Sequence, residues 1–530
     1  MRRWNGWGDD TVDYPLPESA ASYLVSLVGS GQPVPDVPRE KLLAALPVAR
    51  LPEHPLISTD PLARLLHARG QSLPDWLALR GGLIDAFPDG VAYPQDAAQV
   101  RELLALAYQQ QINLIPYGGG TSVTGHINPL PSDQPVLTVD LSRLNSLLHI
   151  DPTSLLATFG AGIAGPDVEA RLRAHGFTLG HYPQSFEYST LGGWIATRSS
   201  GQQSLRYGRI EKLFAGGKIE TPLGQLELPA FPASAAGPDL RELVLGSEGR
   251  LGIITEATVR LTPVPEKEDF HAVFFPDFEH GMAAVRQILG SGIALCMLRL
   301  STATETSTTL ALAGHETLIG TLERLLALRG LGKEKCMLLL GFSGKSDLVH
   351  ANRHAALEIA GKHGGVHVGK TFGSQWHKNR FRTPYLRNTL WEMGYAIDTL
   401  ETAVDWRTVP ELLPAIEQGL HQALAGTGER VHVFTHLSHL YPYGSSIYTT
   451  YLFRLAADPA ESLRRWQAMK SAASRAIVAH HGTISHQHGV GLDHRPYLPA
   501  EKGPLGMAAL QALVRQFDPA GLMNPGKLIA

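Results

Sequence analysis

The sequence predicts an α+β fold built as two domains, and three observations support this. The chain has 530 residues, which is more than one hydrophobic core usually organises. Short helical and strand patterns alternate between residues 96 and 176. A β-rich stretch then runs to residue 261, and Pro263 and Pro265 interrupt it. We therefore expect a first domain that ends near residue 265 and a second domain that follows it.

The composition is that of a folded, turn-rich protein. Hydrophobic residues make up 44% of the chain and charged residues 18%, with 54 glycines and 36 prolines, which excludes the disordered class. The formal net charge is −3, and no run of Lys or Arg forms a stripe, so nothing indicates nucleic-acid binding. A small molecule is the expected ligand.

Cysteine usage and the chain ends bear on the compartment. Cys296 and Cys336 belong to no Cys-x-x-Cys pair, which disfavours a disulfide framework, a zinc ribbon or an iron-sulfur site. The first residues lack the apolar run of a secretory signal, no stretch is apolar enough to span a membrane, and the last residues are not a peroxisomal Ser-Lys-Leu address. We expect a cytoplasmic protein without a transmembrane segment. The sequence leaves open peripheral membrane contact and a homodimer.

Residues 1–85 are rich in Pro and Leu with weak helical periodicity, so we expect a mostly helical lead-in packed on the main body. The clearest element follows it. Asp96 is a helix N-cap with Gln99 three residues on, and Val100, Leu103 and Ala107 continue the apolar face of that helix. The pattern then predicts strands at 112–115, 136–141 and 155–159 and a helix from Pro166 to Gly176.

The β-rich stretch contains a predicted hairpin, with strands at 218–220 and 225–228 around a Thr-Pro-Leu-Gly turn, and an alternating strand at 255–261. The second domain, 266–490, has Leu-rich helices at 316–329 and 460–480 between β-like segments such as 337–342. This pattern indicates a sheet covered by helices.

Glycine-rich and hydroxyl-rich segments are the strongest functional signal. Gly118-Gly119-Gly120-Thr121-Ser122 follows a predicted strand, and glycines without a Cβ let backbone N–H groups approach a pyrophosphate closely. Taken alone, such a cluster is a plain turn about half of the time. The segment lacks the P-loop lysine and the G-x-G-x-x-G spacing, so a nucleotide triphosphatase or a Rossmann site is disfavoured.

Two later segments share this character. Residues 183–201 form a long non-periodic stretch of small and hydroxyl residues, which we interpret as a functional loop. Residues 246–255 bring glycines up to a β run, where backbone could meet the edge of a flat ring. Three such segments in one domain are much less likely to be coincidence than one.

In order and spacing, these segments resemble the FAD domain of the vanillyl-alcohol-oxidase or PCMH-type family. The resemblance spans nearly the whole chain and includes Trp4–Gly8, Phe186–Trp194 and His486–Gly491. It implies a two-subdomain PCMH-type FAD-binding domain at 86–265. It also implies a substrate-binding cap domain with an antiparallel sheet, and a C-terminal segment, 491–530, that returns to the FAD domain.

By this resemblance FAD is held non-covalently, and His126 near the first segment is interpreted as a solvated or capping residue. The implied FAD contacts are Pro116, Tyr117, Gly118, Gly119, Gly120, Thr121, Ser122, Gln184, Ser185, Phe186, Glu187, Tyr188, Ser189, Thr190, Thr197, Arg198, Ser199, Ser200, Glu248, Gly249, Arg250, Leu251, Gly252, Ile253 and Ile254.

Two histidines are candidates for proton transfer. An extended backbone at 483–488 would place His486 and His488 on one face, and paired imidazoles suit proton transfer near neutral pH. Structural or surface roles have about even odds for such a pair taken alone. The pair lacks an obvious third metal ligand nearby, so we expect no metal. By the resemblance, His181 is a further active-site histidine.

Tyr448 lies in a β-prone run where an aromatic residue is usually core, but the resemblance makes it the catalytic acid/base. Arg387 and Arg299 match family positions that hold a substrate phosphate, and planar guanidinium groups suit that role. Arg299 lies between two leucines and should be paired if buried, whereas Arg387 on an amphipathic helix could be an ordinary surface charge. Arg380 and residues 398–402 are weaker candidates for the same cavity.

Two departures from the family pattern leave the chemistry open. Gln487 replaces the middle of three histidines, and Gln184 replaces an acidic residue. Within the family, the chain resembles enzymes that exchange the acyl group of acyl-dihydroxyacetone phosphate for a fatty alcohol without net redox. The alternative is a flavin dehydrogenase or oxidase of a 2-hydroxy acid or glycerol 3-phosphate, which Gln487 favours because an amide cannot carry a proton as imidazole does. Either function requires a small anionic or phosphorylated substrate, a lipid in the first case.

Overall fold

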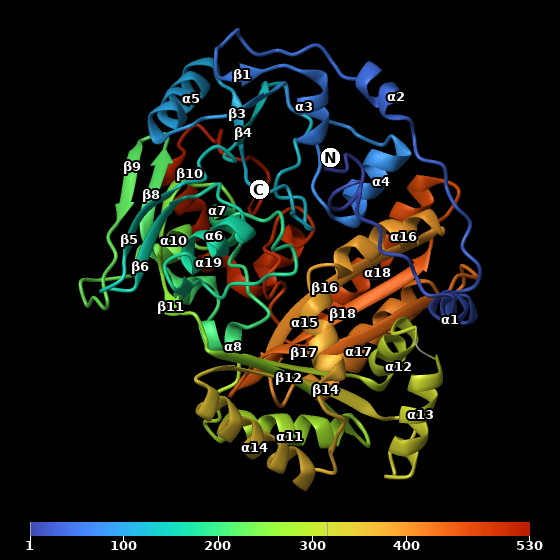
Figure 1. Ribbon diagram of the computed structural model, residues 1–530. Helices are drawn as coiled ribbons and strands as arrows, with labels where there is room; N and C mark the ends of the chain where they lie inside the picture. The colour runs from blue at the N-terminus through green and yellow to red at the C-terminus, as the bar shows by residue number, and fades with distance from the viewer. Residues whose placement is uncertain (1, 315, 530) are drawn as a thin grey trace.

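Two α+β bodies share the chain, and an N-terminal segment runs along both (Figure 1). The computed structural model describes residues 2–314 and 316–529. The first body contains a four-stranded and a five-stranded sheet, and the second is built on a seven-stranded sheet. The predicted α+β class is confirmed.

The four-stranded sheet has the order β1 (Ile57–Ser58), β2 (Gly90–Ala92), β4 (Val136–Asp140) and β3 (Asn113–Tyr117), with β2, β4 and β3 parallel. Helix α5 (Ala97–Gln110) covers it, as predicted: the Asp96 side chain accepts a hydrogen bond from the Gln99 N–H at 2.9 Å. Val100, Leu103 and Ala107 are buried against the strands. The sheet therefore delivers the glycine segment directly after β3.

The five-stranded sheet is antiparallel. Its order is β5 (Leu147–Asp151), β6 (Leu156–Gly160), β10 (Ile253–Arg260), β8 (Phe214–Thr221) and β9 (Gly224–Leu228). The β8–β9 hairpin and the other strands predicted here are confirmed. Short elements complete the body: α6 (Gly165–Arg173), β7 (Phe177–Thr178), α7 (Leu191–Thr197), α8 (Ser204–Tyr207), α9 (Ile210–Leu213), α10 (Arg241–Val244) and β11 (Thr262–Pro263).

The seven-stranded sheet is antiparallel throughout. Its order is β15 (Val366–His367), β12 (Lys267–Phe275), β14 (Cys336–Gly344), β13 (Met297–Ser301), β17 (Val431–Tyr441), β18 (Gly444–Arg454) and β16 (Tyr395–Asp405). Helices α11 (Phe278–Gly290), α14 (Ser346–Lys362), α17 (Val409–Ala423) and α18 (Pro459–Ala479) pack on one face. At its β12 side, the opposite face contacts α12 (Ala303–Leu312), α13 (Glu316–Ala327) and α15 (Thr371–Asn379).

The remaining elements lie outside these three sheets. They are α1 (Glu18–Val28), α2 (Arg39–Ala44), α3 (Pro61–Leu66), α4 (Leu73–Gly81), η1 (Thr383–Tyr385), α16 (Leu386–Glu392), η2 (Arg495–Tyr497) and α19 (Leu498–Phe517). After α19 the chain returns to the first body, where Met523 bridges to Leu114 of β3. Within the described ranges, no helix is both long and apolar enough to cross a bilayer.

Candidate active site

The first glycine segment packs directly against the second segment. A Cβ on Gly118 would lie 2.3 Å from Thr190 Oγ1, and a Cβ on Gly119 would lie only 1.7 Å from the carbonyl oxygen of Tyr188. At Gly119 this distance excludes any side chain, because backbone atoms in a packed interior cannot retreat by that much, and at Gly118 a side chain would displace the Thr190 hydroxyl. Glycine is therefore required here for the two segments to meet.

The third segment joins the same place. The N–H groups of Gly246 and Glu248 donate to the carbonyls of Ile195 and Ala196 at 3.1 and 2.9 Å. A Cβ on Gly249 would lie 2.9 Å from Pro116 Cγ. The three segments that are separate in sequence thus form one continuous wall.

A cavity of about 340 Å³ opens on this wall. Its lining includes Gly118–Gly120 and Thr190, together with Asp140, Gly162 and Asp167 from other loops. The cavity offers glycine backbone without Cβ atoms, and the Arg2 guanidinium, which donates to the Gly119 carbonyl, reaches its edge. Uncovered N–H groups and a nearby cation suit the pyrophosphate of FAD. The residues present therefore fit this cofactor.

The second segment contains a helix, which the sequence analysis missed by treating 183–201 as a loop. Thr190 caps α7 by accepting a hydrogen bond from the Gly193 N–H at 3.3 Å. Helix α7 ends at Arg198, which has a left-handed φ of 53°. The missed signal was the Thr190 cap, because only seven residues follow it before the chain turns and no apolar periodicity could develop.

Several implied FAD contacts direct their side chains elsewhere. The Arg198 side chain pairs with Glu242 at 2.8 Å, and Arg250 donates to the carbonyls of Met523 and Asn524. The Gln184 side chain is exposed. The side chains of Leu251, Ile253 and Ile254 belong to hydrophobic cores. At these positions only the backbone could touch the cofactor.

His126 is buried between two partners, so its interpretation as a solvated residue is wrong. Its Nδ1 lies 2.7 Å from Ser122 Oγ, and its Nε2 lies 3.2 Å from Glu248 Oε1. Glu248 also accepts hydrogen bonds from the N–H groups of Val490 and Gly491 at 2.5 and 2.9 Å. Glu248 therefore fixes the chain just beyond His488 against the FAD wall.

Strand register places a row of functional side chains across the seven-stranded sheet. Tyr448 is the Cα partner of Glu401 on one side and of His436 on the other, so all three side chains share one face. Ser301 of β13 pairs with His436, which puts Arg299 on this face too. It is the face opposite to α11, α14, α17 and α18.

Arg299 is already ion-paired within this row. Its guanidinium contacts Glu305, whose other carboxylate oxygen lies 2.9 Å from His436 Nδ1. Burial opposes ionisation of Glu305, but His436 and Arg299 outweigh it and lower its pKa to about 2. The His436 ring stacks on Tyr448, with centroids 4.9 Å apart and planes at 22°. Arg299 thus supports Tyr448 through His436.

Tyr448 and His488 lie side by side with opposite proton affinities. Their ring centroids are 6.0 Å apart, edge to face, and both side chains are half-buried. Burial raises the pKa of Tyr448, and the charge of Glu401 adds to this. Burial lowers the pKa of His488, although Glu401 opposes the shift. At neutral pH the tyrosine keeps its proton and the imidazole has a free lone pair.

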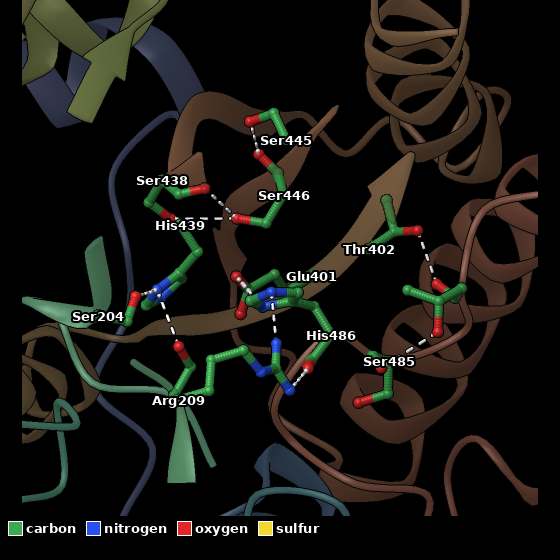
Figure 2. Close-up of polar contacts among 12 residues, drawn as sticks. Ser204, Arg209, Glu401, Thr402, Ser438, His439, Ser445, Ser446, Ser485 and His486 are labelled. Carbon is green, nitrogen blue, oxygen red and sulfur yellow. Dashed lines mark hydrogen bonds and ion pairs between the residues drawn. The ribbon is translucent and has the colours of Figure 1, made fainter. Parts of the chain in front are cut away.

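His486 is separated from this pair, and the predicted extended backbone is wrong: residues 485–489 form no strand. His486 Nδ1 lies 3.0 Å from Glu401 Oε1, while Nε2 lies 2.6 Å from Arg209 Nη1 and 2.7 Å from the Tyr441 hydroxyl. Figure 2 shows Glu401, His439, His486 and Arg209 together. Burial lowers the pKa of His486, and Arg209 adds to the shift. Both nitrogens of this ring are engaged.

Glu401, His439 and His486 offer three ligand atoms within 4.8 Å of one another. A metal on His486 Nδ1 would leave a proton on Nε2, where Arg209 Nη1 also carries hydrogens. Two donors would then face each other at 2.6 Å. Binding of a metal at Nδ1 would therefore conflict with the contact between Nε2 and Arg209.

His181 lies against the second FAD segment. Its Nε2 is 3.2 Å from Ser199 Oγ, and its ring centroid is 4.7 Å from that of Trp194. Burial lowers its pKa to about 3, and Arg209 contributes. Nδ1 is buried without a hydrogen-bond partner in the described part of the chain. His181 is thus a neutral imidazole with one nitrogen available.

Arg387, at the start of α16, has an unusual environment for a cation. The half-buried side chain donates from Nη1 to the Gln71 carbonyl at 2.8 Å and stacks over Trp76, with Cζ 4.4 Å from the ring centroid. Within residues 2–314 and 316–529, no carboxylate lies within 4.0 Å of its guanidinium nitrogens. Burial lowers its pKa, whereas Asp398 and Tyr448 favour its charge. In the described residues, the charge of Arg387 is therefore not neutralised by a direct carboxylate contact.

Sequence reasoning missed most of the supporting network. Arg209, Glu305, His436, His439 and Tyr441 carried no local motif, and they meet only through strand register and the contact between domains. His436 and His439 could have been noticed as two histidines in a β-prone run. Nothing in the sequence near Arg209 marks it.

Comparisons with known proteins agree with this geometry. Residues 88–227 match the FAD binding domain family, and residues 264–528 match the family of FAD linked oxidases, C-terminal domain. FAD is the cofactor, as predicted. The chain is 30% identical to alkyldihydroxyacetonephosphate synthase of Dictyostelium discoideum over 99% of this chain and 93% of the relative. It is 29% identical to the Trypanosoma brucei brucei synthase over 99% and 92%.

A solved structure of an alkyldihydroxyacetonephosphate synthase superposes with a TM-score of 0.82 at 28% identity, covering 99% of this chain and 98% of the other. The similarity thus extends over the FAD body and the seven-stranded sheet alike. The chain belongs to the FAD-linked oxidase family, as a relative of the alkyldihydroxyacetonephosphate synthases.

Proposed function

We propose that the protein exchanges the acyl group of acyl-dihydroxyacetone phosphate for a fatty alcohol, without net redox. The bond between the substrate carbon and the acyl oxygen breaks, the alcohol oxygen bonds to that carbon, and the fatty acid leaves as a carboxylate. One proton is released, because the alcohol loses its hydrogen. The observation that carries the proposal is Arg387, a half-buried cation near Tyr448 that has no carboxylate partner among the described residues.

Arg387 binds the substrate phosphate in this proposal. Trp76 and the Gln71 carbonyl hold the guanidinium in place and leave its other N–H groups free for phosphate oxygens. Arg299 contributes less directly, because Glu305 already occupies part of its guanidinium. Its charge still lies in the same row as Tyr448 and favours an anionic ligand.

Tyr448 and His488 move protons in the proposed reaction. The tyrosine keeps its proton and donates a hydrogen bond to the departing carboxylate oxygen, and the neutral imidazole accepts the proton of the alcohol and then releases it to solvent. His181, neutral with a free Nδ1, is a second acceptor near the FAD wall. His486 contacts Glu401 through Nδ1 and Arg209 through Nε2, and it positions Glu401. When bound, FAD supplies a ring that can accept electron density from the substrate carbon.

We propose that FAD is held without a covalent bond. His126, close to the first segment, is of a residue type that can attach to a flavin, and both of its ring nitrogens are engaged by Ser122 and Glu248. Denaturation with trichloroacetic acid should therefore release all yellow colour into the supernatant. Colour retained in the protein pellet would contradict this proposal.

The reaction is tested by anaerobic mixing of the purified holoprotein with acyl-dihydroxyacetone phosphate and a radiolabelled fatty alcohol. The expected result is a labelled ether lipid with the oxidised flavin band unchanged at the end. Parallel mixtures contain D-2-hydroxy acids or glycerol 3-phosphate. Lasting loss of the flavin band in those mixtures, with no ether product, would overturn the proposal and establish the dehydrogenase.

We also propose a cytoplasmic protein that contacts membrane surfaces to obtain its lipid substrates. Leu318, Leu325 and Leu328, on and just beyond α13, are 69%, 58% and 82% exposed, and such exposed apolar side chains favour lipid contact. Replacing all three by Ser should reduce sedimentation with phospholipid vesicles about tenfold. Turnover of short-chain, water-soluble substrate should not change. Equal sedimentation of the native and the triple-Ser protein would contradict membrane contact through these leucines. Light scattering of the same samples without vesicles measures whether the chain dimerises.

A further inference from the structure

Arg209 connects the two bodies at the centre of the site. It is the residue before α9, in the FAD body, and its guanidinium reaches the segment 485–489 that follows the cap sheet. Nη1 lies 2.6 Å from His486 Nε2, and Nη2 donates to the His486 carbonyl at 2.8 Å. Nη2 also donates to the Arg198 carbonyl at 3.0 Å. One side chain therefore holds the second FAD segment and the histidine segment at a fixed separation.

The same contacts set the tautomer of His486. A guanidinium cannot accept a hydrogen bond, so Nε2 must be the unprotonated nitrogen and Nδ1 must carry the hydrogen. The Nδ1 hydrogen then faces Glu401 Oε1, 3.0 Å away. In the opposite tautomer, Nε2–H would face Arg209 and Nδ1 would face the Glu401 carboxylate with a lone pair. Arg209 thus directs the Nδ1 hydrogen of His486 toward the Glu401 carboxylate.

Glu401 connects His486 with the pair formed by Tyr448 and His488. Its carboxylate is fully buried, and it shares the cross-strand row with Tyr448. Its charge acts on both Tyr448 and His488. Burial opposes its ionisation, but His486 outweighs burial and keeps its pKa well below the ordinary value. Arg209 acts on the reaction only through His486 and Glu401, which makes it a positioning residue.

We propose that Arg209 is the residue that aligns the histidine segment with the FAD wall and keeps the Nδ1 hydrogen of His486 turned toward Glu401. This proposal rests on the proposed reaction for its activity measurements. It goes further by assigning a role to a residue that contacts neither the cavity at Gly118–Gly120 nor the Tyr448 ring.

An open cavity of about 680 Å³ makes a direct test practical. Arg209 and Tyr441 line it, together with Glu211, Tyr443 and Glu501. Glu211 Oε1 forms an ion pair with Arg209 Nε at 2.8 Å and would still be present if the arginine were shortened. Arg209→Ala therefore leaves a vacant place for a guanidinium ion that solvent can reach.

We expect Arg209→Ala to lower kcat roughly 100-fold, because a small misplacement of reacting groups can cost that much. KM for the phosphorylated substrate should change less than about threefold, since Arg387 is untouched. Millimolar guanidinium, far below denaturing concentrations, should raise kcat of this variant at least tenfold. The rise should saturate with guanidinium concentration, and ammonium should not produce it. Arg209→Lys should stay slow, because one ammonium group cannot span Arg198 and His486.

A second readout does not depend on turnover. FAD should dissociate from Arg209→Ala faster than from the native protein, and guanidinium should slow that release, because the Arg198 carbonyl regains its donor. Arg475→Met, which removes an exposed arginine on α18, is the control and should match the native protein in every assay.

The outcomes separate this inference from the proposed reaction. Absence of ether product with the native protein overturns the reaction alone, and FAD release still tests Arg209. The inference is overturned if kcat of Arg209→Ala is native-like. It is also overturned if the variant is folded and FAD-loaded but guanidinium does not restore its lost kcat. If Arg209→Ala does not fold, Arg209→Lys decides, and native turnover in that variant has the same meaning.

Discussion

Gly119→Ala should cost the protein its cofactor, and the structure gives the reason in atomic terms. The new Cβ would lie 1.7 Å from the Tyr188 carbonyl oxygen, 2.7 Å from its carbonyl carbon and 3.1 Å from Ser189 Cα. All three neighbours are backbone atoms, so no side chain can rotate away. The first and second FAD segments must separate by about 1.7 Å before the methyl group reaches ordinary contact.

The magnitude follows from the cost of overpacking. Added methyl groups in a packed interior cost about 1–3 kcal/mol, and more where backbone must move. If this cost of about 3 kcal/mol falls only on the FAD-bound state, it corresponds to roughly 150-fold weaker FAD binding. The assay is quenching of FAD fluorescence on addition of apoprotein, with circular dichroism to confirm folding.

The control for this prediction is Gly361→Ala, in α14. A Cβ there meets nothing within 4 Å, and Ala is the better helix former by about 1 kcal/mol. This variant should bind FAD normally and be equally or more stable to heat. FAD affinity within twofold of the native value in Gly119→Ala would refute the reasoning, because it would mean that the two segments do not need their close approach.

Three further predictions concern the cap sheet. Tyr448→Phe should lower kcat at least 100-fold while FAD stays bound, and full activity measured in the ether-lipid assay would remove Tyr448 from the chemistry. Arg387→Met should raise KM for the phosphorylated substrate about tenfold or more without changing KM for the alcohol; an equal change in both would contradict phosphate binding. Glu305 has a depressed pKa of about 2, so its stabilising contribution, on the order of 3 kcal/mol, is present above pH 4.5 and is lost as pH falls toward 2. Urea unfolding of apoprotein should show that loss in the native chain and not in Glu305→Gln.

Sequence reasoning predicted the scaffold well where local signals decide the structure. Asp96 and the spacing from Val100 to Ala107 define α5 almost to its ends, because a cap and an apolar stripe act within a few residues. The Pro222–Gly224 turn likewise defined the β8–β9 hairpin. Helix α7 escaped because its single signal, Thr190, was followed by glycines.

The site was predicted in part, since its geometry depends on contacts between distant segments. The glycines indicated a cofactor, yet the roles of Gly118 and Gly119 depend on Thr190 and Tyr188, about 70 residues later. His486 and His488 were assigned one shared face, but Glu401 and Glu248 draw their segment into a turn. Arg209 lay outside every motif, because its importance comes only from the contact between the two bodies.

The hairpin of β17 and β18 carries one irregularity, a register shift between Ser438 and Leu440. His439, the residue in between, has a φ of 44°, and its ring centroid comes within 5.1 Å of that of His486. Because of this shift, one strand supplies His436 to the row that contains Tyr448 and His439 to the group around Glu401. In a regular strand, two side chains lie on the same face only when an even number of positions separates them. Deleting a single residue here would leave a longer and more regular hairpin. It would also remove His439 from the group around Glu401. In this fold the inserted residue is therefore what allows the strand to contribute a second histidine to the site.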